Sequence, residues 1–141
     1  MSADNTFMPV APSRGRGLNT GLWVIQVLLA VFFLVAAAGP KLFGQSVAVE
    51  MFDQIGLGQW FRFFVGTLEL AGAIGLLVPR LAGLAALGLI GVMVGAVFTQ
   101  LFVLDDPLLA ITPVLLGVVL GLIAWGRGRE TRALLGARRV S

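Results

Sequence analysis

Glu69 is the strongest candidate for chemistry in this sequence, because an acidic residue stands in the middle of an apolar segment. The surrounding residues read GTLELAGAIG from Gly66 to Gly75, so several small side chains flank the carboxyl group. A charged side chain at the centre of a bilayer costs about 2.5–3.5 kcal/mol and normally faces the interior of a helix bundle. We therefore expect Glu69 to point into a bundle, where its small neighbours leave space for a ligand, water or a partner side chain.

Further polar residues fall toward one common end of the apolar segments and could share a pocket with Glu69. Arg62 lies seven residues before Glu69, which places it on the same helical face two turns away. Lys41 follows the first apolar segment, and its long stem can reach inward or toward the membrane surface. The predicted polar pocket consists of Lys41, Arg62, Glu69, Thr99, Gln100 and Thr112.

The residue types that are missing exclude much of the usual chemistry. The sequence has no Cys, and therefore no disulfide, thiolate nucleophile or iron–sulfur ligand. It also has no His and no Tyr, so the commonest metal ligand and the usual general base are absent. We expect no metal site and no resident cofactor. The missing residue types argue against catalysis by the chain on its own but leave the question open. A quinone or a lipid is the bound molecule to consider.

The composition indicates which elements must position these residues. Hydrophobic residues make up 58% of the chain and charged residues only 12%, whereas soluble domains carry about 25% charged residues. A helix needs about 20 apolar residues to cross a bilayer. The sequence therefore predicts one all-α, polytopic membrane four-helix bundle, with spans at residues 21–39, 60–78, 81–104 and 107–126.

The remaining segments are predicted from their polarity and their glycine and proline residues. Residues 1–20 are polar and read as a disordered cytoplasmic arm, and residues 127–141 read as a basic cytoplasmic tail. Pro40 and the glycines of GPKLFG, residues 39–44, are expected to end or kink the first helix near the membrane surface. Residues 45–59 are too short and too charged to span, so we expect an amphipathic segment at the membrane interface.

The basic residues indicate the orientation. Arginines precede the first span, follow the second at Arg80, and occur five times after the fourth. With four spans these residues share one side, and basic residues mark the cytoplasmic face, so both termini should be cytoplasmic. This distribution explains the net charge of +3 without a nucleic-acid partner. We expect a multi-pass protein of a bacterial cytoplasmic (inner) membrane.

Glycines at helical spacing predict close helix contacts. Small residues three or four positions apart let helix backbones approach each other in a membrane. Packing within the bundle is favoured over a homo-oligomer interface. The predicted packing residues are Gly88, Gly91, Gly95, Gly117 and Gly121.

Three functions fit these residues. The polar side chains can brace the bundle, as in a structural or chaperone-like membrane protein without a ligand. They can form a pocket for a lipophile with a polar part, such as a quinone or a lipid head group. Proton or small-solute transport fits less well, because a translocation path normally shows polar residues at several depths.

Three motifs together resemble the DoxX-like family of small four-helix membrane proteins. They are GPKLFG from Gly39, FDQIGLGQWFRFFVGTLELAGAIGLLVPR from Phe52 and GLIGVMVGAVFTQLF from Gly88, and the resemblance covers about residues 22–126. It implies a four-helix bundle in a family linked to quinone-coupled sulfur oxidation, quinol oxidases and redox-stress complexes. Lys41 and Glu69 match the family pattern. The implied role is an accessory or ligand-binding subunit that works with a larger redox subunit.

The chain departs from that family at one position. Members often carry a His near the outer end of the third helix, where this chain has Thr99 and Gln100. Gln100 can form hydrogen bonds, but it neither titrates near neutral pH nor serves as a usual metal ligand. The resemblance therefore supports binding here better than catalysis.

The predicted orientation can be tested with reporter fusions at Ser141 and at Asp105. A reporter that is active only outside the cytoplasm should be active at Asp105 and inactive at Ser141, because one span separates the two sites. The same activity at both positions would contradict the predicted topology.

Overall fold

The computed structural model describes residues 15–140, and every regular element within that range is a helix. This confirms the all-α fold class. Segment η1 is a π-helical stretch that continues α1 and leads directly into α2. The elements are α1 Arg16–Phe32, η1 Phe33–Ala38, α2 Gly39–Phe43, α3 Ser46–Ile55, α4 Gln59–Leu76, α5 Ala82–Phe102, α6 Ile111–Gly126 and α7 Gly128–Val140.

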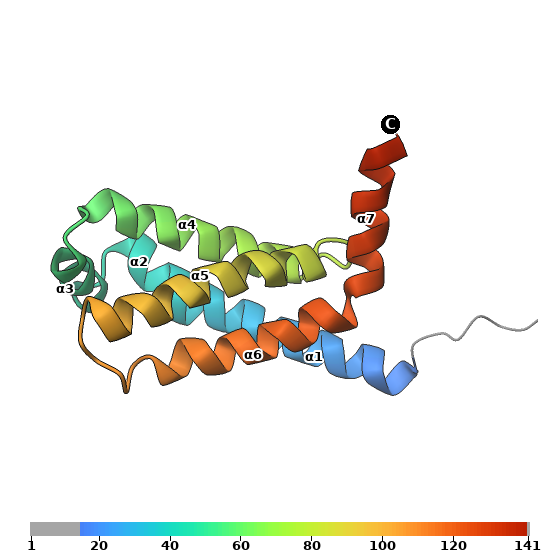
Figure 1. Ribbon diagram of the computed structural model, residues 1–141, viewed down its shortest axis with the longest axis horizontal. Helices are drawn as coiled ribbons and strands as arrows, with labels where there is room; N and C mark the ends of the chain where they lie inside the picture. Colours follow the sequence, from blue (N-terminus) through green and yellow to red (C-terminus); the bar gives the residue numbers. More distant parts are fainter. Residues whose placement is uncertain (1–14, 141) are drawn as a thin grey trace, which may run out of the picture.

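The long helices lie side by side, with short helices at the two ends (Figure 1). The α1–η1–α2 helix packs on α4, α4 packs on α5, α5 packs on α6, and α6 returns to α1. Helix α3 lies at one end of this arrangement and α7 at the other; we call these the α3 end and the α7 end. The apolar core between the long helices consists of Leu29, Ala30, Phe33, Ala37, Ala73, Leu76, Ala86, Leu89, Met93, Leu120 and Ile123.

Within the part of the chain that the structure describes, two helices are long and apolar enough to cross a membrane, namely Arg16–Phe43 and Ala82–Phe102. A third span results if α6 and α7, which are bent by 62° at their junction, count as one. Helix α4 is not among them, and it carries both Arg62 and Glu69. Each predicted span corresponds to a helix, whereas the number of crossings stays a prediction.

Pro40 does not end the first helix, which runs on to Phe43. A proline has no N–H, and in a regular α-helix its ring collides with the carbonyl group four residues earlier. The chain changes its winding just before this point, because the N–H of Gly39 donates to the carbonyl of Leu34, five residues back. The helix ends at Gly44, one of the two glycines that were expected to end or kink it, whose φ of 72° is in the left-handed region that glycine tolerates best.

The predicted contact role is wrong for Gly88, Gly91 and Gly95. All three are exposed, and apart from the adjacent residues and backbone of α5 itself, no atom lies within 4 Å of where a Cβ would be built. A Cβ at Gly121 would likewise meet no atom within 4 Å, whereas a Cβ at Gly117 would make an ordinary contact with Met93 at 3.8 Å. The α5 stripe faces a cavity rather than a neighbouring helix.

Other glycines make the close helix contacts. A Cβ at Gly72 would lie 2.5 Å from the side chain of Leu89, and one at Gly75 would lie 2.7 Å from the Cβ of Ala85. These two glycines of α4 therefore let α5 approach closely. Both glycines are among the small neighbours of Glu69, which were expected to leave space for a ligand, water or a partner side chain. At these two positions α5 occupies that space.

The terminal segments depart in part from the prediction. Residues 16–20 begin α1, so a disordered arm over 1–20 is wrong for them, and residues 1–14 lie outside the described part. Most of the basic tail forms α7. Residues 46–55 form α3, which is amphipathic as expected, because Ala48 and Phe52 are buried while Glu50 and Asp53 are exposed; its place at the membrane interface stays a prediction. The first and last helices begin and finish at the α7 end (Figure 1).

Replacing Gly75 with Ala should destabilise the protein by about 1–3 kcal/mol, because the new methyl group overpacks the contact with Ala85. Gly91→Ala is the matched control. It should be neutral or stabilising by up to about 1 kcal/mol, because alanine favours the helix and meets open space. Thermal unfolding of both variants in the same detergent measures the difference. Equal losses at the two positions would contradict the helix contacts described above.

Candidate functional site

A cavity of about 670 Å³ lies among η1, α4, α5 and α6, and α3 closes one end of it. We call it the Glu69 cavity. Most of its wall is apolar and includes Phe33, Phe61 and Leu116. Of the predicted polar pocket, Lys41, Glu69, Thr99, Gln100 and Thr112 line it, whereas Arg62 does not. The structure therefore gathers most of the predicted residues around one volume.

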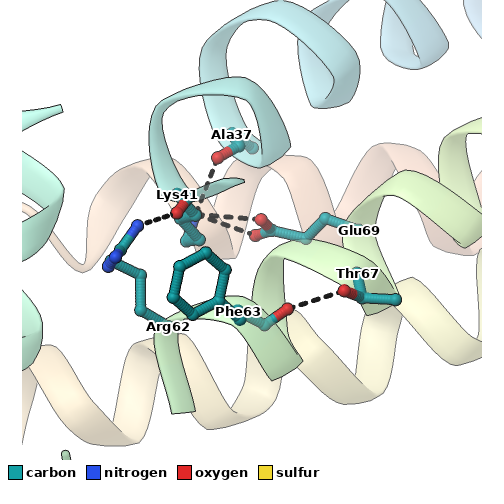
Figure 2. A network of polar contacts seen from close by, with 6 residues as sticks. All are labelled: Ala37, Lys41, Arg62, Phe63, Thr67 and Glu69. Atoms are coloured by element: carbon teal, nitrogen blue, oxygen red, sulfur yellow. Dashed lines mark hydrogen bonds and ion pairs between the residues drawn. The ribbon is translucent and has the colours of Figure 1, made fainter. Parts of the chain in front are cut away.

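An ion pair between Lys41 and Glu69 forms the polar wall of this cavity (Figure 2). The Nζ atom of Lys41 lies 2.9 Å from Oε2 of Glu69 and donates a hydrogen bond to Oε1 at 3.2 Å. It also donates to the backbone carbonyl of Ala37 at 3.2 Å. Glu69 is only 3% exposed, so this pairing offsets the cost of placing its charge among apolar helices.

Arg62 supports the ion pair from behind. Its Nη1 donates to the backbone carbonyl of Lys41, and its Nε donates to Oε1 of Gln59 at 2.7 Å. Its guanidinium group also lies 4.2 Å from the ring centre of Phe63. Arg62 thus satisfies a carbonyl at the C-terminal end of α2 and fixes the backbone from which Lys41 reaches Glu69.

The same network continues into α3. The Nε2 atom of Gln59 donates to Oδ1 of Asp53 at 2.6 Å and to the carbonyl of Val49 at 3.1 Å. Gln59 therefore connects α3, which closes the cavity, with Arg62 on α4. A chain of polar contacts runs from the exposed Asp53 inward to the buried Glu69.

Gln100 of α5, which also lines the cavity, has one polar atom that the described protein does not satisfy. Its Oε1 atom is buried and has no hydrogen-bond partner among the described residues. Leaving such an atom without a partner costs about 1–3 kcal/mol, which a donor on a bound molecule would remove. Thr99 is already engaged, since its hydroxyl donates to the carbonyl of Gly95 at 2.8 Å, and Thr112 is exposed.

The glycine stripe of α5 has its role here. Gly88, Gly91 and Gly95 line the Glu69 cavity, and their missing side chains provide part of its volume. Leu68 of α4 also lines the cavity and is exposed. The cavity is therefore open toward the outside of the helix bundle along α4 and α5.

Sequence reasoning missed a second buried polar group at the α7 end. Gln26 is fully buried, donates to the carbonyl of Leu76 at 2.7 Å, and accepts a hydrogen bond from Nε of Arg127 at 2.7 Å. Arg127 also donates to Asn19 and lies 5.4 Å from the ring centre of Trp23. Gln26 was visible as a lone polar residue in an apolar segment. Its partner, 101 residues away, was visible only as the first residue of a basic tail.

Together, the fold and the site define an all-helical membrane protein with a cavity walled by apolar side chains and one buried ion pair. The sequence pattern of the DoxX-like family matches residues 24–125. This chain therefore belongs to the DoxX-like family, as the three motifs indicated. No curated protein and no solved structure matches it.

Glu69→Ala should destabilise the folded protein by about 3–5 kcal/mol, because it leaves the Lys41 ammonium group without its buried partner. Adding Lys41→Met to Glu69→Ala should recover part of the loss, since the unpaired charge is then removed as well. Glu50→Ala is the control, because Glu50 is an exposed carboxylate on α3. Chemical unfolding in detergent measures all three. An additive double variant would show that the two side chains are not coupled.

Proposed function

We propose that this protein is a four-span membrane subunit, with both termini in the cytoplasm, that binds a small lipophile in the Glu69 cavity. The ligand we propose is a quinone or a lipid with a polar head, and the role is that of an accessory subunit of a membrane redox system. The proposed location is the bacterial cytoplasmic membrane. The observation that carries the proposal is an apolar cavity of about 670 Å³ with a few polar groups in its wall.

The size and lining of the cavity support a small organic ligand. Ligand pockets usually measure about 300–1,000 Å³ and combine an apolar lining with a small number of polar groups. The exposed glycines and Leu68 leave the cavity open along α4 and α5. In a four-span placement that opening faces the hydrocarbon region, which is where an apolar ligand is concentrated.

The polar groups support a ligand that carries hydrogen-bonding groups. Oε1 of Gln100 can accept a hydrogen bond, and the amide nitrogen of the same side chain can donate one. The carboxylate of Glu69 has acceptor capacity beyond its contacts with Lys41. A head group with hydroxyl or carbonyl oxygens matches this combination, and an apolar tail matches the remainder of the wall.

Transport is less well supported than binding. The two buried polar groups, around Glu69 and around Gln26, are separated by apolar core residues that include Phe33, Ala73 and Leu76. A path for protons or solutes would require polar groups or water through this layer. A purely structural role is a second candidate, because the protein itself already provides acceptors for Nζ of Lys41, at both carboxylate oxygens of Glu69 and at the carbonyl of Ala37.

Ligand binding can be tested by extracting the natively purified protein with organic solvent and identifying the lipophiles by mass spectrometry. We expect one compound to be retained in a fixed ratio to the protein. Gly95→Leu should abolish its retention, because the leucine side chain fills the cavity from the open position on α5. Gly121→Leu, at a helical glycine that also has open space but does not line the cavity, should retain it.

The outcomes separate the candidates. If the wild type retains no lipophile and Gly95→Leu melts at the same temperature, the polar residues act as a structural brace. A larger redox subunit that co-purifies supports the accessory role. Equal retention by both glycine variants would place the lipophile outside the Glu69 cavity.

A further inference from the structure

Helix α7 leaves the bundle at an angle that the rest of the fold does not require. It is bent by 62° from α6, and it crosses the end of the bundle so that its last part projects beyond the other helices (Figure 1). A straight continuation over its 13 residues would move the chain by about 20 Å along the α6 axis. With the bend, the movement along that axis is only about 9 Å.

The bend is fixed by packing. Thr131 is buried, and its hydroxyl donates to the carbonyl of Arg127 at 3.1 Å. A Cβ on Gly83, at the start of α5, would collide with Oγ1 of Thr131 and come within 3.3 Å of the side chain of Arg127. Helix α7 therefore rests on the end of α5 through the face that carries Thr131.

The start of α7 has tryptophan side chains of the kind that are typical of a membrane surface. Trp125 is 76% exposed and precedes α7 by three residues, and Trp23 lies beside Arg127. Tryptophans are enriched where the hydrocarbon region meets the lipid head groups. A helix that begins there and leaves at 62° stays close to the head groups along its length.

The side chains of α7 are distributed as in a helix that lies on a membrane. Leu134 and Leu135 follow Thr131 by three and four residues, so they share its face toward the bundle. Leu135 is nevertheless 49% exposed, so this apolar side chain is available for contact with lipid. Arg129 and Arg132 are exposed on the remaining surface.

The charges at the α7 end are complementary to an anionic surface. Among residues 15–136, whose side chains are described, the exposed or half-buried acidic groups other than Glu130 all belong to the α3 end: Glu50, Asp53, Asp105 and Asp106. The α7 end carries Arg16 and Arg80 in addition to the arginines of α7. Anionic lipids attract basic segments at a membrane surface.

We propose that α7 lies on the cytoplasmic surface of the bilayer and binds the phosphate groups of anionic phospholipids, with Leu135 inserted between them. This inference rests on the four-span placement proposed above and not on the ligand of the Glu69 cavity. The bound lipids would stabilise the position of α7 across the end of α5. They would thereby also stabilise the contacts of Arg127, which lie at the α7 end of the bundle.

The test uses the full chain, which contains no native cysteine. Leu135→Cys is labelled with an environment-sensitive fluorophore, and the protein is reconstituted in phosphatidylcholine vesicles with or without phosphatidylglycerol. Protection of the label from acrylamide should increase when phosphatidylglycerol is present and disappear at high salt. Adding Arg129→Gln and Arg132→Gln should lower the ratio of membrane-bound to unbound α7, which the label reports, by about fivefold for each arginine.

Two controls make the result specific. Adding Glu50→Gln and Asp105→Asn instead, at exposed charged residues of the α3 end, should leave the protection in place. Val118→Cys, at an exposed position in the middle of α6, should be quenched by lipids brominated near the ends of their chains.

Each contrary result has a distinct meaning. Equal protection in neutral and anionic vesicles would overturn the recognition of anionic lipid. A label at position 118 that deep bromolipids do not quench would overturn the four-span placement, and with it this inference. Neither result bears on retention of a lipophile in the Glu69 cavity, which the extraction experiment measures separately.

Discussion

Burying Glu69 among apolar helices requires a cation close to it, and several features of the structure serve that requirement. Lys41 comes from a different helix and reaches the carboxylate only because the first helix continues past Pro40. The π-helical segment before the proline allows this continuation. Arg62 then fixes the backbone of Lys41. Removing one partner of such a pair is costly, so these elements depend on one another.

The two ends of the bundle are held by different kinds of contact. At the α3 end, polar side chains from α2, α3 and α4 form one network that ends at Glu69. At the α7 end, a buried hydrogen bond between Gln26 and Arg127 connects α1 with the junction between α6 and α7. The apolar core lies between these groups. The lining of the Glu69 cavity does not include Gln26, so the two polar groups stay separate.

The Glu69 cavity exists because α5 carries glycines where its neighbours are not close. Glycines at helical spacing are usually interpreted as helix contacts, and Gly72 and Gly75 of α4 have that role. The identical residue type on α5 instead provides open volume beside Glu69 and Gln100. Spacing alone does not distinguish the two uses, because both require only that a side chain be absent from one helical face.

The sequence by itself determined the class of protein, the positions of the long helices and most residues of the polar pocket. These follow from local properties: long apolar runs form helices, and a charge within such a run must face inward. Only the tertiary structure decided which glycines contact a neighbouring helix. It also decided that the first helix continues beyond Pro40, and that Arg62 supports Lys41 instead of lining the cavity. It also paired Gln26 with Arg127. Each of these depends on how far apart two helices lie and how they are rotated, and those quantities arise from packing over the whole bundle rather than from any one segment.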